Sequence, residues 1–370
     1  MSKNKIIIAF GTRPELIKLA PVIDQFKKHG QRNKLFLVHT AQHHQLSKPD
    51  LDYFGIDIDY QFKLERENDS LSLLNGLLLL AFHKLLVYLK ENEIHPSALI
   101  ALGDTCSAFV SGQFAFYEKI PFLHIEAGLR TGDFSEPFPE EYFRKSMASM
   151  ASLHFAPTTS AAQNLLSEQI SPDTILITGN TVIDHLREIS ENMDIERDNA
   201  GKKIVLITIH RRENILYKLD FIRQKIVNYC LIHPEKQFLW IDNPGYKITS
   251  GIAPRPANLE VINAVCFTEM LTYYRSAELI ITDSGGMQEE ACYLNIPALI
   301  FRAKTERMES IDSGPAKYFE DDPDLNTVIA KLKQQTNEAS KVLFGEGTAS
   351  KKIYDAIIDW ELTNNSSTNI

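Results

Sequence analysis

The sequence predicts an α/β protein with two domains, each built around a parallel sheet. Short runs of aliphatic and β-branched residues alternate with longer segments of helical periodicity. The alternation pauses in a charged, poorly patterned stretch, residues 188–203, and then restarts. The chain has 370 residues, more than a single hydrophobic core usually supports. Strands that alternate with helices form right-handed crossovers and hence parallel sheets.

The first half of the chain is expected to form one Rossmann-like domain, residues 1–180. Its β-branched and aliphatic runs predict strands. These are Lys5 to Phe10, Lys34 to Thr40, Ala98 to Leu102, Phe122 to Ile125, His154 to Ala156 and Thr174 to Ile177. The helical patterns between them are Pro14 to His29, Ser70 to Lys90, Thr105 to Tyr117, Pro139 to Met150 and Ser160 to Glu168.

The second half repeats this layout, and a second Rossmann-like domain is expected over residues 181–348. Its predicted strands are Lys203 to Thr208, Gln237 to Ile241, Leu259 to Ile262, Leu279 to Thr282 and Ala298 to Phe301. A last helix, Ala349 to Leu362, is expected to pack back on the first domain. The polar residues 363–370 are expected to be a disordered tail.

The overall charge argues against a general affinity for nucleic acid or anionic membranes. The formal net charge is −9, so no basic excess is present to neutralise phosphates. Any phosphate must be bound by a local set of donors. No membrane insertion is expected either, because polar residues interrupt the apolar segment Leu71 to Leu89. A buried helix is predicted there.

Cysteine usage favours a reducing compartment. No CxxC spacing occurs among the four cysteines, which lie in or beside apolar runs: Cys106, Cys230, Cys266 and Cys292. Buried free thiols are therefore predicted, and a cytoplasmic location fits them. The N-terminal apolar run, Ile6 to Ile8, is too short for a signal-peptide core.

Unusual polar clusters follow the predicted strands almost immediately. They are Gly11 to Glu15, Gln42-His43, Gly103 to Thr105, His124 to Gly128, His210 to Asn214 and Asp283 to Gly286. Gly and Thr at one such turn are explained by backbone freedom and helix capping. Six charged clusters are poorly explained by capping alone. Because ligands bind at the carboxyl ends of parallel strands, we expect the clusters to face a shared cleft.

The cluster Asp283 to Gly286 is predicted to bind a diphosphate. Paired glycines let the backbone approach an anion, and the helix that follows offers free N–H groups and the positive end of its dipole. Glu290, about one turn into that helix, can accept from a ribose hydroxyl. Glu289 is expected to point elsewhere, and a solvated position suits it.

Cations and carboxylates complete the expected site. Arg13, Arg211 and Arg212 can contact phosphate oxygens, and His210 can donate to a departing phosphate. The acidic residues at the predicted cleft are Asp104, Glu126, Glu140 and Glu141. Carboxylates massed in a partly desolvated site can act as general acids and bases or as metal ligands. No compact metal-binding spacing accompanies them, so no metal is expected.

An ordered series of motifs resembles the non-hydrolysing UDP-N-acetylglucosamine 2-epimerases from Phe10 to about Gly314. The series is GTRPE-hydrophobic-IK (Gly11 to Lys18), AQH (Ala41 to His43), GDT (Gly103 to Thr105), HIEAGLRTGD (His124 to Asp133), PxPEExxR (Pro137 to Arg144), FAPT (Phe155 to Thr158), GNTVID (Gly179 to Asp184), HRREN (His210 to Asn214), TDSGGxQEEA (Thr282 to Ala291) and TERxE (Thr305 to Glu309).

The resemblance implies a GT-B-like fold and inversion at C2 of UDP-N-acetylglucosamine without metal or nicotinamide. Its implied catalytic residues are Asp104, Glu126, Glu140 and His210. Its implied UDP-binding residues are Arg13, Lys18, Arg144, Arg211, Ser284, Gly285, Gly286, Glu290 and Arg307. A candidate activator site would comprise Gln42, His43, Arg66 and Arg212. A homodimer formed through the first domain is also implied, as is a role in synthesis of a surface polysaccharide: capsule, O-antigen or cell-wall glycan.

The chain departs from the family pattern at several positions. Ile241 replaces the activator-site histidine, Phe143 an asparagine after PEE, Met270 an aromatic near the uracil, and Met308 the proline of TERPE. A residue of the usual RDxTER segment is also changed, giving Arg302-Ala303-Lys304. A changed sugar pocket, and a different UDP-2-acetamido sugar as substrate, are therefore open alternatives. So are a hydrolysing epimerase that releases UDP and N-acetylmannosamine, a GT-B glycosyltransferase and an inactive nucleotide-sugar sensor.

Overall fold

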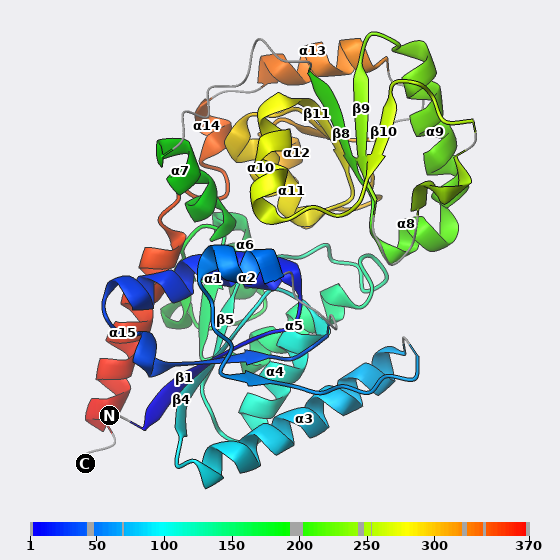
Figure 1. The fold of residues 1–370 in the computed structure, drawn as a ribbon. Helices are drawn as coiled ribbons and strands as arrows, with labels where there is room; N and C mark the ends of the chain where they lie inside the picture. Colours follow the sequence, from blue (N-terminus) through cyan, green and yellow to red (C-terminus); the bar gives the residue numbers. More distant parts are fainter. Residues whose placement is uncertain are drawn as a thin grey trace. The chain divides into compact units, whose positions relative to one another are not determined.

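The computed structural model describes residues 3–42, 48–68, 70–192, 203–242, 248–252, 254–319, 324–335 and 338–367. The chain divides into two compact units (Figure 1). Unit 1 comprises Met1–His185 and Gly345–Ile370, and unit 2 comprises Leu186–Phe344.

Unit 1 contains a seven-stranded sheet in the order β3-β2-β1-β4-β5-β6-β7, with every pair parallel. The strands are β1 (Asn4–Phe10), β2 (Leu35–His39), β3 (Tyr60–Gln61), β4 (His95–Leu102), β5 (Phe122–Ile125), β6 (Leu153–Ala156) and β7 (Ile175–Ile177). The strand order reverses between β1 and β4. The chain that leaves these two strands therefore turns to opposite faces of the sheet, and ligands of open parallel sheets usually bind at such a reversal.

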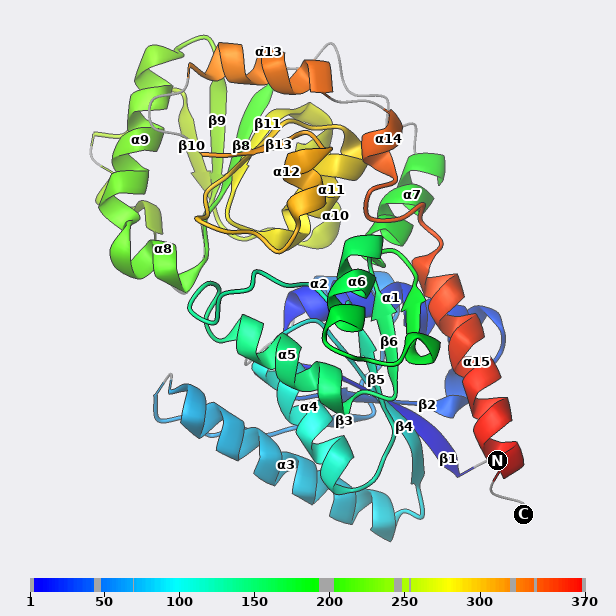
Figure 2. The same ribbon diagram turned by 180° about the vertical axis from the view of Figure 1, so that it is seen from behind.

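Helices cover both faces of this sheet. They are α1 (Arg13–Lys28), α2 (Lys48–Phe54), α3 (Leu71–Glu91), α4 (Cys106–Tyr117), α5 (Glu140–Met150), α6 (Thr159–Ser167), the start of α7 (Val182–Asn192) and α15 (Ala349–Ser367), with short 3-10 turns at Arg32–Lys34 and Pro172–Thr174. One buried cluster joins the sheet to α3, α4 and α5, and a second joins it to α1 and α15. Figure 2 shows α15, in red, along the side of unit 1. Burial of Ile353 and Ile357 holds it there.

Helix α3 buries only one of its faces, so the predicted buried helix is wrong in part. Leu74, Leu78 and Phe82 lie in the core, whereas Leu80 and Val87 on the other face are 52% and 44% exposed. By length and composition alone, α3 is the one helix among the described residues apolar enough to cross a membrane. The core helix of a soluble protein passes the same test, and α3 packs against α4 inside unit 1.

Unit 2 contains a six-stranded parallel sheet in the order β10-β9-β8-β11-β12-β13. The strands are β8 (Ile204–Thr208), β9 (Gln237–Ile241), β10 (Leu259–Ile262), β11 (Ala277–Thr282), β12 (Ala298–Ile300) and β13 (Ala316–Tyr318). The helices are α8 (Arg212–Tyr217), α9 (Leu219–Ile232), α10 (Phe267–Ser276), α11 (Gly285–Leu294), α12 (Met308–Asp312), α13 (Leu325–Gln335) and α14 (Glu338–Lys341), with a 3-10 turn at Ile248–Gly251. The strand order reverses between β8 and β11.

Two sequence predictions need correction. Helix α15 continues through Ser367, so residues 363–367 are helical and not a disordered tail. The Asn and Ser residues there cost only a few tenths of a kcal/mol each, and no Gly or Pro stops the helix. Cys266 is partly exposed at the N-cap of α10, whereas the other three thiols are buried as expected.

Candidate active site

Glu15 joins the turns that follow β1 and β4. One of its carboxylate oxygens accepts from the amides of Gly11 and Thr12 at 3.0 and 2.8 Å, and the other accepts from the Thr105 hydroxyl at 2.7 Å. Burial raises the pKa of the Glu15 carboxyl to about 6, although these hydrogen bonds oppose the shift. A side chain at Gly11 would overlap the hydroxyls of Thr40 and Ser107. The carboxyl edge of the unit 1 sheet is thus closely packed around Glu15.

Asp104 lies in the turn after β4 and contacts a buried cation. The Nε of Arg144 donates to Asp104 Oδ2 at 2.8 Å, and another nitrogen of the guanidinium donates to Glu141 at 2.7 Å. Glu141 also accepts from the amides of Thr131 and Gly132. Arg144 was expected to contact UDP, and in this structure it holds the carboxylates of Asp104 and Glu141.

Glu126 follows β5 and is held in a comparable way. Its backbone adopts a left-handed conformation, with φ of 65°. Lys18 Nζ lies 2.6 Å from Glu126 Oε2, and Asn180 Nδ2 donates to the same oxygen at 3.2 Å. His124 donates to the Gly103 carbonyl at 2.7 Å, which ties the β5 end to the turn that carries Asp104. Burial lowers the pKa of His124 to about 4, so its ring is neutral at neutral pH.

The remaining predicted residues of unit 1 are more scattered. Glu140 begins α5, next to the fully buried Glu141. Arg13 forms an ion pair of 2.6 Å with the buried Asp50. Of the candidate activator residues, Arg66 donates to the Gln42 carbonyl at 3.2 Å. The Gln42 side chain accepts hydrogen bonds from the amide and the hydroxyl of Ser107. The other two candidates, His43 and the side chain of Arg212, lie outside the described residues.

In unit 2, α11 begins directly after β11, as the diphosphate prediction requires. Ser284 is its N-cap and accepts from the Met287 amide at 3.5 Å. A β-carbon at Gly286 would meet only the Ser284 hydroxyl, at 4.0 Å, so the backbone there is accessible. The first amides of a helix are donors without helical partners, and this end suits an anion.

Asp283 fixes the turn that carries His210. Its buried carboxylate accepts from the amides of His210 and Arg211 at 3.0 and 2.9 Å, and from Asn214 Nδ2 at 2.9 Å. The His210 Nδ1 lies 3.3 Å from Asp283 Oδ1, and the His210 side chain is 45% exposed. The two strand ends at the reversal in unit 2 are therefore connected through one carboxylate.

Glu289 and Arg307 form a buried ion pair, and this corrects the expectation that Glu289 is solvated. Arg307 Nε donates to Glu289 at 2.7 Å, and the guanidinium also contacts Glu306. All three residues are buried. Arg307, expected at the UDP, packs directly beneath Gly285. Glu290 accepts a hydrogen bond from the Tyr274 hydroxyl.

The departures from the family pattern have different surroundings. Phe143 is buried and stacks on Phe109, with ring centroids 4.5 Å apart, so it belongs to the core of unit 1. Ile241 is the last, buried residue of β9. Met270 is partly buried on α10.

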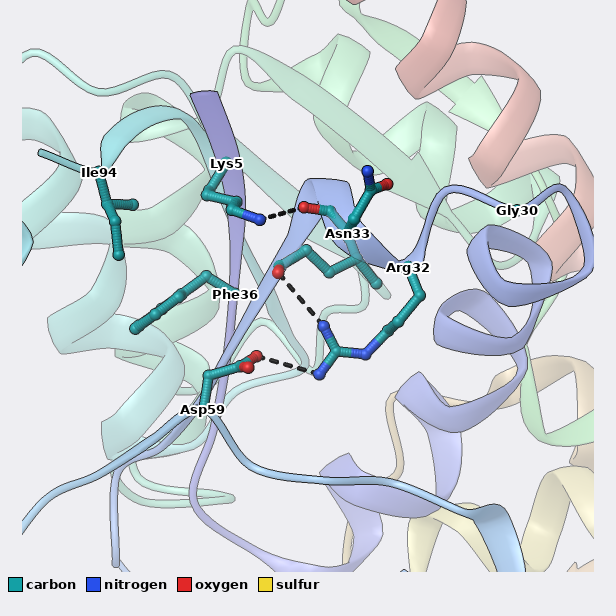
Figure 3. A pocket seen from close by; sticks show the side chains of 8 residues that line it. Lys5, Gly30, Arg32, Asn33, Phe36, Asp59 and Ile94 are labelled. Atoms are coloured by element: carbon teal, nitrogen blue, oxygen red, sulfur yellow. Dashed lines mark hydrogen bonds and ion pairs between the residues drawn. The ribbon is translucent and has the colours of Figure 1, made fainter. Parts of the chain in front are cut away.

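A shallow pocket elsewhere in unit 1 shares none of these residues. Lys5, Phe36 and Ile94 line it at the amino ends of the strands, together with Arg32 and Asp59, which contact each other at 3.0 Å (Figure 3). Among the described residues, no group of three His, Cys, Asp or Glu side chains has the arrangement of a metal site.

Two parallel-sheet α/β units with polar clusters at their strand ends define a protein of the GT-B-like class. A family model for UDP-N-acetylglucosamine 2-epimerase matches residues 26–358. A UDP-N-acetylglucosamine 2-epimerase of Salmonella borreze is 32% identical over 97% of this chain and 99% of its own length. The chain belongs to the UDP-N-acetylglucosamine 2-epimerase family.

Solved structures agree in fold. The crystal structure of UDP-GlcNAc 2-epimerase from Neisseria meningitidis bound to UDP-GlcNAc superposes with a TM-score of 0.84 at 31% identity, covering 96% of this chain and 100% of that chain. The Methanocaldococcus jannaschii enzyme in complex with UDP-GlcNAc and UDP gives 0.81 at 28% identity, covering 96% and 99%. Acinetobacter baumannii MurG, at 16% identity and a TM-score of 0.53, shares the fold alone.

Proposed function

We propose that the protein interconverts UDP-N-acetylglucosamine and UDP-N-acetylmannosamine by inverting C2. The observation that carries the proposal is the pair of carboxylates at neighbouring strand ends of unit 1, each in contact with its own cation. Arg144 holds Asp104 and Lys18 holds Glu126. A carboxylate with a fixed orientation is what abstraction of a weakly acidic C–H proton requires.

Unit 2 is proposed to bind the UDP moiety. The amides at the start of α11 donate to the diphosphate, and the accessible backbone of Gly286 permits close approach. His210, held by Asp283, donates to the phosphate oxygen as it departs. Arg211, Ser284 and Glu290 are proposed to contribute further polar contacts to UDP.

The proposed reaction is an elimination followed by an addition. A carboxylate of the set Asp104, Glu126 and Glu140 removes the C2 proton while the C1–O bond to UDP breaks on the opposite face. The products are 2-acetamidoglucal and UDP. UDP then adds back at C1, and C2 is protonated from the other face. No electrons are gained or lost overall, so the scheme needs no redox cofactor.

NMR of the product mixture from UDP-N-acetylglucosamine tests this function. The proposal predicts reversible appearance of UDP-N-acetylmannosamine at constant total nucleotide sugar. Steady accumulation of UDP and free N-acetylmannosamine would indicate a hydrolysing enzyme and contradict the proposal. The same assay with other UDP-2-acetamido sugars identifies the preferred substrate.

The candidate activator site gives a second readout. Arg66 and Gln42 lie together in unit 1, but Ile241 stands where the family has a histidine. We propose that a second UDP-N-acetylglucosamine activates this protein weakly. Epimerisation of purified UDP-N-acetylmannosamine should then begin without a lag. A lag that added UDP-N-acetylglucosamine removes would contradict weak activation.

We also propose that the protein is a cytoplasmic homodimer whose interface includes α3. The outer face of α3 exposes Leu80 and Val87, and the nearby end of α4 exposes Phe116 and Tyr117. A second copy of this face would remove the apolar surface from water. Light scattering of wild type and Leu80→Glu tests this: a dimer that becomes monomeric is expected, and a monomeric wild type would contradict it.

A further inference from the structure

Asn180 contacts Glu126, one of the proposed acid/base carboxylates, and has no role in the proposed mechanism. It follows β7 in the segment Gly179 to Asp184 and is buried. Its Nδ2 donates to Glu126 Oε2 at 3.2 Å, and its Oδ1 accepts from the Val182 amide at 3.2 Å. The Asn180 side chain therefore stabilises its own loop through one atom and contacts the Glu126 carboxylate through another.

Glu126 needs such support because of its backbone. A positive φ is unfavourable for a residue with a side chain, and surrounding contacts must maintain it. Lys18 and Asn180 converge on the same oxygen of Glu126. Lys18 supplies charge, whereas the planar amide of Asn180 supplies a donor of defined direction.

The loop that carries Asn180 is itself fixed by the C-terminal part of unit 1. A β-carbon at Gly345 would lie 2.9 Å from the Gly179 Cα, so the two glycine backbones are in close contact. Asp184 accepts from the first amides of α15, Ala349 and Ser350, at 3.0 and 2.7 Å. The Gly345 contact thus packs the backbone next to Asn180, whereas Asp184, four residues further on, caps α15.

We propose that Asn180 is a positioning residue that orients the Glu126 carboxylate for proton transfer at C2. This inference rests on the proposed epimerase function. The simpler alternative is that Asn180 only stabilises its loop through the Val182 amide. The two roles use different atoms of the same side chain, so they can be separated.

Asn180→Asp separates them. An aspartate keeps an oxygen for the Val182 amide but places a second oxygen, with negative charge, against Glu126 Oε2. Asn180→Ala removes both contacts. The matched control is Asp184→Asn in the same segment, which weakens the cap on α15 without touching Glu126.

Steady-state kinetics and thermal unfolding of the four proteins test the proposal. Asn180→Asp should lower kcat about 100-fold with little change in KM, because a misplaced catalytic group costs about that much. Its Tm should stay close to that of the wild type. Asp184→Asn should lower Tm by a few degrees and leave kcat within about twofold.

Three outcomes of these measurements would contradict the positioning role of Asn180. If Asn180→Asp keeps the wild-type kcat, or loses activity only in proportion to folded protein, the residue is structural. If that variant does not fold, Asn180→Ala decides, since an unchanged kcat there also refutes positioning. A wild type without epimerase activity would instead refute the proposed function, and this inference with it.

Discussion

Arg307 lies where a side chain at position 285 would have to go. A β-carbon added to Gly285 would stand 2.8 Å from the Arg307 Cζ. Gly285→Ala should therefore shift the buried guanidinium and destabilise the protein by about 1–3 kcal/mol, the usual range for overpacking. Gly286→Ala is the control, because a β-carbon there meets only Ser284 Oγ at 4.0 Å. Urea unfolding measures both, and equal stabilities for the two variants would contradict the packing.

Glu289 should be far more important for stability than an ordinary surface glutamate. Removing it leaves the Arg307 charge buried with one carboxylate partner fewer. We expect Glu289→Ala to cost about 3–5 kcal/mol, as for other broken buried pairs. Asp355→Asn breaks the exposed pair with Lys351 and should cost well under about 1 kcal/mol. Comparable losses in chemical denaturation would show that Glu289 is not buried.

The expectations about Glu289 and Phe143 show where sequence patterns stop being informative. Aliphatic and β-branched runs predicted most strands of both sheets, because a strand buried on both faces is apolar along its length. The short strands β3 and β13 were missed because each includes a polar residue, Gln61 and Lys317, so no aliphatic run marks them. Whether Glu289 faces water or Arg307 depends on a partner many residues away, and the same holds for Phe143 on Phe109.

In the candidate site, too, local sequence features were predictable and contacts between distant residues were not. Residues at the ends of predicted strands were identified because parallel topology brings strand ends to one edge. Which side chain contacts which carboxylate was not predictable, since Lys18, Arg144 and Asn180 reach Glu126 and Asp104 from other elements. Lys18 and Arg144, which the family resemblance assigns to UDP binding, contact the carboxylates of Glu126 and Asp104 in this structure.

Glu15 should make the stability of the protein decrease as pH rises from about 4.5 to about 6. Burial raises the pKa of its carboxyl from 4.5 to about 6, so the folded state retains the proton that the unfolded state releases in this window. Relative to Glu15→Gln, the wild type should lose about 2 kcal/mol of unfolding free energy over that range, and the difference should then stay constant. If the wild type instead gains stability relative to the variant as pH rises, folding lowers the pKa of Glu15, and the prediction is wrong.

Arg144 should not be replaceable by lysine. Its guanidinium donates to Asp104 and Glu141 through separate nitrogens, and a lysine ammonium lacks that fork. We expect Arg144→Lys to lower kcat about 10- to 100-fold. Lys145→Ala, on the same helix but 42% exposed, is the control and should keep full activity. Retention of full kcat in Arg144→Lys would refute the assigned contact.

Hydrogen exchange at C2 tests the central claim most directly. Purified protein is incubated with UDP-N-acetylglucosamine in deuterated water, and deuterium at C2 is followed by NMR beside Asp104→Asn. The proposed elimination and re-addition predicts deuterium at C2 of both epimers with the wild type, and a large loss of exchange in the variant with UDP binding retained. Absence of C2 exchange with every UDP-2-acetamido sugar would contradict the proposed function.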